Sequence, residues 1–247
     1  MNNKRWEIAQ KYEKEYWERG ADKFASGAEK ESGWHSWYAW KVSKFEEELS
    51  KTKYEINRSN CKVLEIGSGP IGMVACLKWG ERYAIDPLAE FYKEKQSLVK
   101  LRDSNVKYLA GTGEKIPFDD GFFNIVIIDN VLDHVSAPDH VLKEIYRVLS
   151  KNGLLYIIVN IHTYWGYLLH SLLAKLNIDK GHPYSFTAEK IRDFLNTHQL
   201  IVNSESVNNY YEARQRDRES NSFKDKIKGY TGLSEFVYSA VCLKKVE

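Results

Sequence analysis

Three glycines and one acid have the types and spacing of a ligand-binding turn. Gly67, Gly69 and Gly72 form a G-x-G-x-x-G pattern directly after an apolar run that ends at Ile66, and Asp86 follows. A ligand can approach the backbone at such a turn because glycine carries no Cβ. An acid about twenty residues further on can accept hydrogen bonds from ribose hydroxyls. The spacing therefore predicts a site for an adenosine-type ligand.

Glu65, two residues before the first glycine, discriminates between ligands of this type. A carboxylate beside the turn would repel the pyrophosphate of a nicotinamide dinucleotide. It would attract the ammonium and sulfonium groups of S-adenosyl-L-methionine. We therefore expect S-adenosylmethionine as the cofactor and disfavour an NAD-dependent oxidoreductase. The alternative left open is a structural strand-turn-helix that binds no ligand.

Three side chains further along the chain are candidates for a general base. His134 lies five residues past Asp129, and Asp133 and His162 are the next candidates. The imidazole group has an ordinary pKa of about 6.5, which suits removal of a proton from a hydroxyl acceptor. A histidine that only shapes the floor of the pocket is the alternative interpretation of His134.

Apolar runs separated by helical patterns must position these residues. Such runs predict strands at 62–66, 82–86, 106–110, 123–128, 154–159, 201–207 and 236–243. Continuous apolar strands between helices indicate a parallel sheet that is covered on both faces. The expected fold class is α/β: a doubly wound, seven-stranded, mostly parallel sheet whose last strand is antiparallel. A helical N-terminal segment precedes the sheet, and a helical insertion follows the fifth strand.

Local signals predict where several helices begin. The glycine turn should lead directly into a helix. Ser136 and Asp139 fit a capping box, with Pro138 in the first helical turn, and Thr187 can cap a later helix. Residues 205–228 mix both signs of charge and are interpreted as a solvated connection between the last two strands.

Four segments occur in one order between about residues 61 and 160: VLEIGSGPIG, YAIDPL, GTGEKIPFDDGFFNIVIIDNVLDHV and VLKEIYRVLSKNGLLYIIV. In this order and spacing they resemble the class I S-adenosylmethionine-dependent methyltransferases, in particular the type 11 (ubiquinone/menaquinone-biosynthesis-like) group. The resemblance implies a methyltransferase activity with S-adenosylmethionine as the methyl donor.

The resemblance also implies a role for individual residues. Glu65 would hold the glycine loop in shape, Gly67 and Gly69 would approach the methionine part of the cofactor, and Asp86 would bind its ribose. The remaining implied cofactor contacts follow the second, third and fourth strands: Pro87 near the adenine, Thr112, Gly113 and Glu114 beside its edge, and Asp129 and Asn130 beneath the sulfonium. Thr112 departs from the acid that the family usually carries. The segment Pro70-Ile71-Gly72 shifts a family glycine by one position.

Residues 1–60 are expected to form a helical cap on a methyltransferase domain that spans 61–247. The first helix should end at Gly20 and be followed by a loop over 19–31, which contains two glycines. The cap is rich in tryptophan, which offers stacking faces to an acceptor.

The second helical stripe of the cap sorts its aromatic side chains into two groups. Trp34, Trp37 and Tyr38 fall on the apolar face and are expected in the core. His35 and Trp40 lie off that face and are the candidates for contact with the acceptor.

The insertion at 163–181 carries an amphipathic stripe that includes Trp165, a further candidate for contact with the acceptor. The stripe fits a lid over an apolar pocket or a helix packed onto the domain. Docking to a membrane surface is disfavoured because the polar side, with His170, Ser171 and Lys175, lacks the expected basic residues.

The composition excludes several classes of protein. The net charge is only +2, so the strong basic footprint of a duplex-binding protein is missing and no nucleic-acid partner is expected. The three cysteines are widely spaced and form no C-x-x-C pair, which disfavours a metal site. No run of about 18 apolar residues occurs, so no membrane span is expected, and the location expected is cytoplasmic.

These observations favour an S-adenosylmethionine-dependent methyltransferase that acts on oxygen or nitrogen of a small molecule, such as a sugar, a lipid-linked saccharide or a secondary metabolite. A methyltransferase acting on RNA or protein is one alternative. Against it, residues 129–132 read Asp-Asn-Val-Leu, not the Asn/Asp-Pro-Pro-aromatic tetrapeptide of adenine- and cytosine-directed enzymes. A non-catalytic partner subunit with the same fold is the other alternative.

Overall fold

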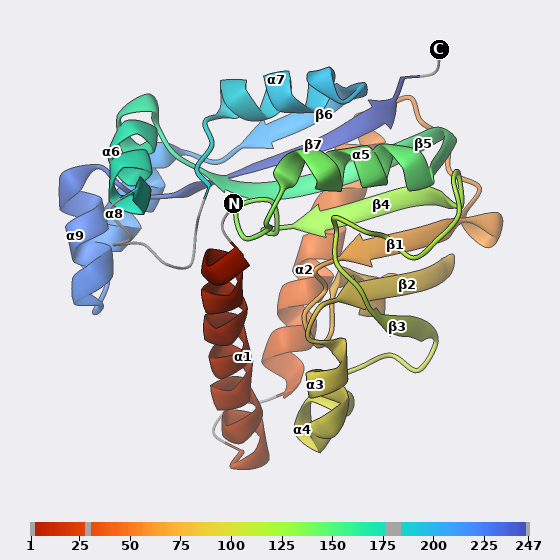
Figure 1. Cartoon of the computed structure of the whole chain (residues 1–247), viewed down its shortest axis with the longest axis horizontal. Coiled ribbons are helices and arrows are strands. Elements are labelled where there is room, and N and C mark those ends of the chain that lie inside the picture. The colour runs from red at the N-terminus through yellow and green to blue at the C-terminus, as the bar shows by residue number, and fades with distance from the viewer. Residues whose placement is uncertain (1–2, 28–30, 176–183, 246–247) are drawn as a thin grey trace.

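Seven strands form one sheet, and helices cover both of its faces (Figure 1). The computed structural model describes residues 3–27, 31–175 and 184–245. The strands are, in chain order, β1 (Lys62–Ile66), β2 (Glu81–Asp86), β3 (Val106–Ala110), β4 (Phe123–Asp129), β5 (Leu149–Ile161), β6 (Leu200–Val207) and β7 (Phe236–Lys244). These bounds confirm the seven predicted strands, with β5 longer than expected.

The strands lie in the order β3-β2-β1-β4-β5-β7-β6. The pairs from β3 across to β5 are parallel, whereas β7 runs antiparallel to both of its neighbours, β5 and β6. The predicted fold class, including the antiparallel last strand, is confirmed. Between β1 and β4 the strand order reverses, and such a switch point leaves a crevice at the carboxyl ends of the strands.

The α-helices lie before, between and after these strands. They are α1 (Asn3–Ala25), α2 (Glu31–Ser50), α3 (Ala89–Glu94), α4 (Gln96–Val99), α5 (Pro138–Val148), α6 (Tyr164–Lys175), α7 (Ala188–Thr197), α8 (Tyr210–Glu219) and α9 (Phe223–Thr231). The last part of the insertion expected at 163–181 lies outside the described residues.

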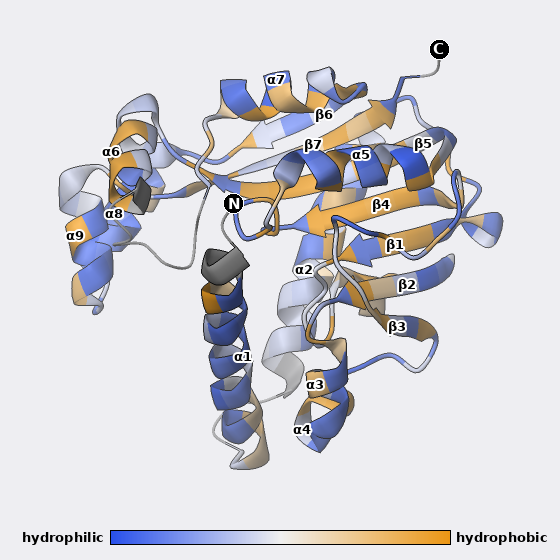
Figure 2. Cartoon of the chain, in the orientation of Figure 1, coloured by the Kyte–Doolittle hydropathy of each residue, from blue (hydrophilic) through white to orange (hydrophobic). Residues whose placement is uncertain are grey.

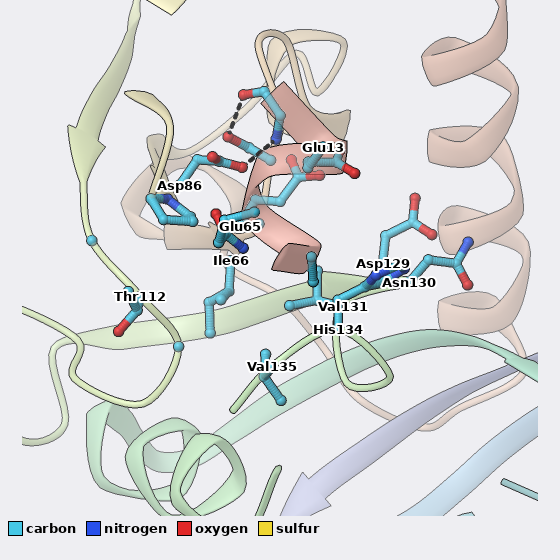
Figure 3. Close-up of a pocket in the computed structure, with 18 of the residues that line it drawn as sticks. Glu13, Glu65, Ile66, Asp86, Thr112, Asp129, Asn130, Val131, His134 and Val135 are labelled. Atoms are coloured by element: carbon cyan, nitrogen blue, oxygen red, sulfur yellow. Dashed lines mark hydrogen bonds between the residues drawn. The ribbon is translucent and has the colours of Figure 1, made fainter. Parts of the chain in front are cut away.

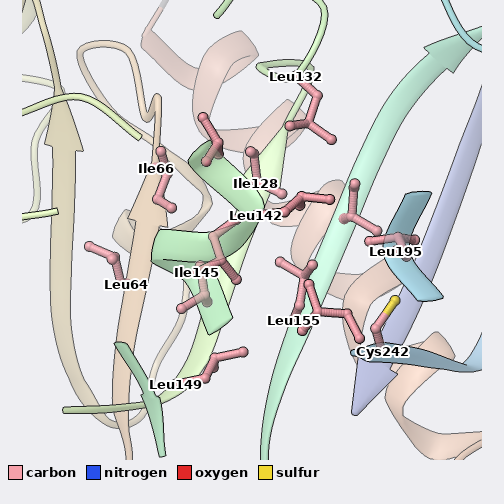
Figure 4. Close-up of a cluster of buried hydrophobic side chains, with 14 of the residues drawn as sticks. Leu64, Ile66, Ile128, Leu132, Leu142, Ile145, Leu149, Leu155, Leu195 and Cys242 are labelled. Carbon is pink, nitrogen blue, oxygen red and sulfur yellow. The ribbon is translucent and has the colours of Figure 1, made fainter. Parts of the chain in front are cut away.

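The pleat of each strand sends alternate side chains to two apolar cores, one on each face of the sheet. Leu64 and Ile66 of β1 join α5 and α7 on one side, where Leu142 and Leu195 pack (Figure 4). The preceding residue, Val63, joins the core on the side of α1–α4. Glu65 shares this second side with Val63, so its side chain points away from the core that contains Leu64 and Ile66.

Only a short 3₁₀ turn, Met73–Ala75, follows the glycine loop, so the helix expected there is wrong. The helix α2 occupies that face of the sheet. Trp79 of the connection donates a hydrogen bond to Glu46 (2.9 Å), and Phe45 packs on Tyr156 of β5 with 4.8 Å between ring centroids. Because α2 already buries this side of the sheet, the crossover from β1 to β2 can remain short.

The helix α1 continues through Gly20 to Ala25, so the expected end at Gly20 is wrong. Trp17 and Ala21 are buried on one face of the helix, and Phe24 packs edge-on against Trp34 of α2 with 5.8 Å between centroids. These tertiary contacts outweigh the cost of about 1 kcal/mol for glycine inside a helix.

Trp37, expected in the core, is half exposed and stacks on Trp40 with 5.0 Å between ring centroids. The buried face of α2 consists instead of Tyr38, Phe45 and Leu49. A step of three residues from Trp34 to Trp37 falls short of a full helical turn, so the stripe turns away from the sheet at Trp37.

The expected capping box of α5 is wrong, although Pro138 does occupy its first turn. The residue that caps the helix is Ala137, and the hydroxyl of Ser136 donates to Glu114 at 2.6 Å instead. The predicted cap of α7 is confirmed, since Thr187 accepts a hydrogen bond from the backbone of Lys190. Residues 205–228 are more than a solvated connection, because α8 and the first part of α9 form within them.

Candidate functional site

A cavity of about 360 Å³ lies at the carboxyl ends of β1, β2 and β4 (Figure 3). This volume is within the range of about 300–1,000 Å³ that is usual for small-molecule sites. Its walls come from α1, α2, the glycine loop and the turns after β2, β3 and β4. The cavity occupies the switch point of the sheet, where doubly wound folds bind their ligands.

The glycine loop forms the wall of the cavity beyond β1. Gly67 and Gly69 have φ angles of +68° and +59°, which L side chains rarely adopt. A Cβ on Gly67 would lie 2.3 Å from the side chain of Val131, and one on Gly69 would lie 3.1 Å from the indole of Trp17. Glycine is therefore required here by backbone conformation and by packing against residues of the chain itself.

Glu65 is buried and ties the glycine loop to the turn that follows it. Its Oε2 atom accepts a hydrogen bond from the backbone of Val74 at 2.9 Å. Burial raises the pKa of Glu65 to about 7, although hydrogen bonds from Val74 and Met73 oppose the rise. The carboxylate lines the cavity, so a cationic group there would favour its ionised form.

Asp86 ends β2 and holds two loops at once. Its Oδ2 atom accepts from the backbone of Gly69 at 2.9 Å, and its Oδ1 atom accepts from the backbone of Leu88 at 2.8 Å. Burial raises the pKa of Asp86 to about 6. Each carboxylate oxygen retains a further lone pair for a ligand hydroxyl, and Pro87 lines the cavity beside it.

The turn after β3 contributes Thr112, Gly113 and Glu114 to the lining. Glu114 is engaged with the start of α5, because its Oε1 atom accepts from both the backbone and the hydroxyl of Ser136. Burial alone would raise its pKa, but these hydrogen bonds lower it. This carboxylate therefore remains ionised and serves to order the loop between β4 and α5.

Asp129, at the end of β4, forms a buried ion pair with Lys41 of α2. Its Oδ1 atom is also buried and has no hydrogen-bond partner among the described residues. The neighbouring Asn130 has a φ of +52°, and its side chain accepts from the backbone of Asn160 at 3.0 Å. Asn130 thus fastens the end of β4 to β5, while Asp129 lines the cavity beside Lys41.

The sequence interpretation missed the side chains that the N-terminal helices add to the cavity. Ala9, Gln10, Glu13, Tyr16 and Trp17 come from α1, and Tyr38 and Lys41 come from α2. Figure 3 shows Glu13 on α1 close to the ends of the strands. The apolar stripe of α1 indicated that the helix packs, but helical periodicity alone does not reveal which element it packs against.

Of the three base candidates, His134 lines the cavity, and its Nε2 atom lies 3.5 Å from Oδ2 of Asp133. Asp133 is itself buried. His162 is placed elsewhere: it is buried, its ring stacks on His170 with 5.0 Å between centroids, and its Nε2 atom lies 4.0 Å from Glu235. His134 and Asp133 therefore lie together at the cavity, whereas His162 lies outside its lining.

The three residues expected to contact the acceptor do not line this cavity. The backbone carbonyl of His35 accepts a hydrogen bond from the thiol of Cys76 at 3.7 Å. The side chain of Trp40 is half exposed and stacks on Trp37. On α2 the side chains that point into the cavity are those of Tyr38 and Lys41. Trp165 is exposed and donates a hydrogen bond to Thr231 of α9.

Part of the chain that forms this cavity is similar to a known protein family. The model of a family described as "Methyltransferase domain", type 11, matches residues 64–157. This stretch contains the glycine loop, Asp86, Asp129 and His134. Residues 64–157 are therefore similar to the methyltransferase domain of the type 11 group.

Relatives of the methyltransferase domain include a protein of Haemophilus ducreyi named ubiquinone/menaquinone biosynthesis C-methyltransferase UbiE. It is 28% identical over 121 residues, which are 43% of this chain and 47% of that protein. The chain thus matches about half the length of the curated relatives. The helices α1 and α2, which complete the cavity, precede the matched region.

Solved structures share the fold at low identity. A putative sarcosine dimethylglycine methyltransferase from Galdieria sulphuraria superposes with a TM-score of 0.59 at 14% identity, over 85% of each chain. A geranyl diphosphate C-methyltransferase from Streptomyces coelicolor, crystallised with S-adenosyl-L-homocysteine, also gives 0.59, at 12% identity over 83% of this chain and 79% of that one. At this identity the likeness concerns the fold alone.

Proposed function

We propose that this chain is a methyltransferase that uses S-adenosyl-L-methionine and acts on a small-molecule acceptor. The observation that carries the proposal is the carboxylate of Asp86, fixed by two backbone hydrogen bonds at the wall of the switch-point cavity. An acid at the end of the second strand, next to a glycine turn, suits ribose hydroxyls. The match of residues 64–157 to the methyltransferase domain supports the same cofactor.

The charges of the cavity fit a cationic cofactor. Glu13, Glu65, Asp86 and Asp129 all line it, whereas Lys41 is already paired with Asp129. The buried Oδ1 atom of Asp129, which lacks a partner among the described residues, can accept a hydrogen bond from an ammonium group. A pyrophosphate would meet the same carboxylates and be repelled. In our proposal Asp86 holds the ribose and Asp129 faces the positively charged end.

When bound, S-adenosylmethionine supplies an electrophilic methyl group for an in-line displacement. The chain must then hold the acceptor and remove its proton. In this proposal the imidazole of His134 accepts the proton, and the carboxylate of Asp133, 3.5 Å from its Nε2 atom, stabilises the imidazolium that forms. Side chains of α1 and α2 cover the cavity and reduce the access of water.

The acceptor in this proposal is small, and its reacting atom loses a proton. A cavity of about 360 Å³ that also holds the cofactor leaves little room for a macromolecule. Oxygen or nitrogen was expected from the sequence. The H. ducreyi relative is named a C-methyltransferase, so carbon is the third candidate atom. His134 could act as the general base for an acceptor oxygen, nitrogen or carbon.

Methylation of RNA is the less favoured alternative. Five carboxyl side chains line the cavity, and their negative charges would repel phosphate groups. A partner subunit without catalytic activity is disfavoured because Glu65, Gly67, Gly69 and Asp86 together keep the wall of the cavity ordered.

Calorimetric titration with S-adenosylhomocysteine, with NAD as the control ligand, tests the proposal. We expect binding of the former alone. Asp86→Ala should weaken it by about ten- to a hundredfold, since hydrogen bonds to a charged group contribute about 1.5–3 kcal/mol. The control Asp119→Ala removes an exposed acid outside the cavity and should bind as the wild type does. Binding of NAD alone would overturn the proposal.

A further inference from the structure

Two helices at the carboxyl-end side of the sheet, α6 and α9, meet where the first turn of α6 reaches the end of α9 (Figure 1). The indole of Trp165 on α6 donates a hydrogen bond to the carbonyl of Thr231 on α9, at 3.1 Å. The helix α8 supports α9 from behind, because Arg214 and Arg218 both donate to the carbonyl of Gly229. We call α6 and α9 the outer helix pair. Hydrogen bonds thus join α9 to α6 at one end and to α8 along its side.

The helix α6 turns its apolar side outward. Tyr164, Leu168 and Leu172 share one face at steps of four residues and are exposed, and Trp165 beside them is 60% exposed. The side toward the domain holds Gly166 and the buried His170. A surface helix of a globular protein normally shows the opposite pattern, with its apolar stripe on the core.

The helix α9 repeats this inverted pattern. Phe223, Ile227 and Tyr230 share one face, and Phe223 and Tyr230 are 79% and 68% exposed. Gly229, on the inward side, is buried against Arg218. Figure 2 shows orange, hydrophobic bands on α6 and α9 at the edge of the molecule. Two contacting helices therefore present apolar side chains to the surroundings.

Lysines border the apolar face of α9 on both margins. At 100° per residue, Lys224 lies on one side of the line through Phe223, Ile227 and Tyr230, and Lys226 lies on the other. Both lysines are exposed, and neither forms an ion pair with another described residue. An apolar, aromatic face with lysines on its margins is the pattern of a helix that lies in a lipid–water interface.

We propose that the outer helix pair docks on the surface of a bilayer that contains anionic lipid. The aromatic and leucine side chains would enter the boundary between headgroups and acyl chains, and Lys224 and Lys226 would contact anionic headgroups. A span is not involved, since no helix within the described residues is long and apolar enough to cross a membrane. The basic residues that α6 lacks are supplied by α9, which the sequence alone did not place beside it.

The docking surface lies at the same edge of the sheet as the cavity. The helix α6 begins at Tyr164, three residues after β5 ends, and the cavity is lined by the ends of β1, β2 and β4, which run parallel to β5. Docking would therefore orient that edge of the methyltransferase domain relative to the bilayer. The inference concerns a surface and stands independently of the proposed transfer chemistry.

Flotation of the full chain with lipid vesicles tests this inference. We expect the protein to float with vesicles of phosphatidylcholine mixed with phosphatidylglycerol, and far less with phosphatidylcholine alone. Leu168→Ser/Phe223→Ser should lower the partition coefficient by about tenfold for each side chain removed. Lys224→Glu/Lys226→Glu should abolish the preference for anionic vesicles. All four side chains are on the surface, so loss of the fold is not expected.

Two matched controls keep the test specific. Leu109→Ser/Ile201→Ser removes exposed apolar residues from the two edge strands, and Lys100→Glu/Lys151→Glu makes the same change of net charge elsewhere. Both should bind vesicles as the wild type does. Equal binding by the outer-helix variants and their controls, or no flotation of the wild type, would overturn the inference. So would a dimer, seen by sedimentation equilibrium, that Leu168→Ser/Phe223→Ser dissociates, because a second copy would then cover the surface.

Discussion

At the scale of single residues, His134 and Asp133 form the pair to which the proposed function assigns proton transfer. His134→Ala should lower kcat by about 10²- to 10⁴-fold, the usual contribution of a general base, with any acceptor that the wild type methylates. Affinity for S-adenosylhomocysteine should stay nearly the same. Asp133→Asn should lower kcat less and shift its pH profile, since Asp133 acts through the imidazole. Unchanged turnover of His134→Ala would remove His134 from the mechanism.

The ion pair of Lys41 and Asp129 joins the N-terminal helices to the end of β4, and both side chains are largely buried. Lys41→Met should lower the free energy of unfolding by about 3 kcal/mol, because it leaves a buried carboxylate unpaired. Lys44→Met, on the same helix, removes an exposed ion pair with Glu47 and should cost less than about 1 kcal/mol. Urea unfolding of the two variants measures the difference. Equal losses would show that the buried pair contributes no more than a surface one.

At the scale of elements, α2 takes the place of the helix that usually connects the first two parallel strands. It reaches from the connection, through Trp79 and Glu46, across to β6, where Ser204 donates to Glu48 at 2.6 Å. The same helix carries Tyr38 and Lys41 into the cavity. One element therefore covers a face of the sheet and supplies part of the site, which couples the stability of the domain to the shape of the cavity.

Gly20 lies within α1, where a glycine makes the helix less stable than an alanine would. A Cβ built on Gly20 would meet only the ring of Trp17, at 3.9 Å, which is ordinary contact. Gly20→Ala should therefore raise the free energy of unfolding by about 0.5–1 kcal/mol, because glycine has the larger conformational freedom to lose. Gly69→Ala is the contrasting variant, since its φ of +59° strains any L side chain. In thermal unfolding, the Tm of Gly20→Ala should be higher than that of the wild type, and the Tm of Gly69→Ala should be lower.

At the scale of the whole molecule, two buried acids make stability depend on pH. Burial raises the pKa of Glu65 to about 7 and that of Asp86 to about 6, above unfolded values of about 4. Between about pH 4 and pH 7 the folded protein therefore binds more protons than the unfolded chain, and stability falls as pH rises. Above that window both groups are ionised in both states, and the fall should end.

Glu65→Gln keeps an oxygen to accept from Val74 but cannot titrate. The free energy of unfolding of this variant should fall by about 3 kcal/mol less than that of the wild type between about pH 4 and pH 7. This difference corresponds to the raised pKa of Glu65. Glu47→Gln is the control, because that exposed group has a lowered pKa and cannot cause the fall. Urea unfolding at several pH values measures the slope. A slope unaltered in Glu65→Gln would place the titration elsewhere.

The seven strands, the glycine turn and the acids at the strand ends can all be predicted from the sequence alone. Each of these depends on neighbours close in the chain: runs of apolar residues, glycines where φ is positive, and an acid that follows directly on a strand. Local patterns do not predict the structure where packing outweighs helix propensity, as at Gly20. They also fail where a distant residue binds a capping side chain, as Glu114 accepts from the hydroxyl of Ser136.

The side chains that complete the site depend on contacts between elements that are far apart in the sequence. Lys41 meets Asp129 across 88 positions of sequence, and Trp17 covers Gly69. A helical stripe predicts that a helix packs, but the choice of partner depends on the summed fit of many surfaces. That fit is a property of the folded chain and is not encoded in any local segment.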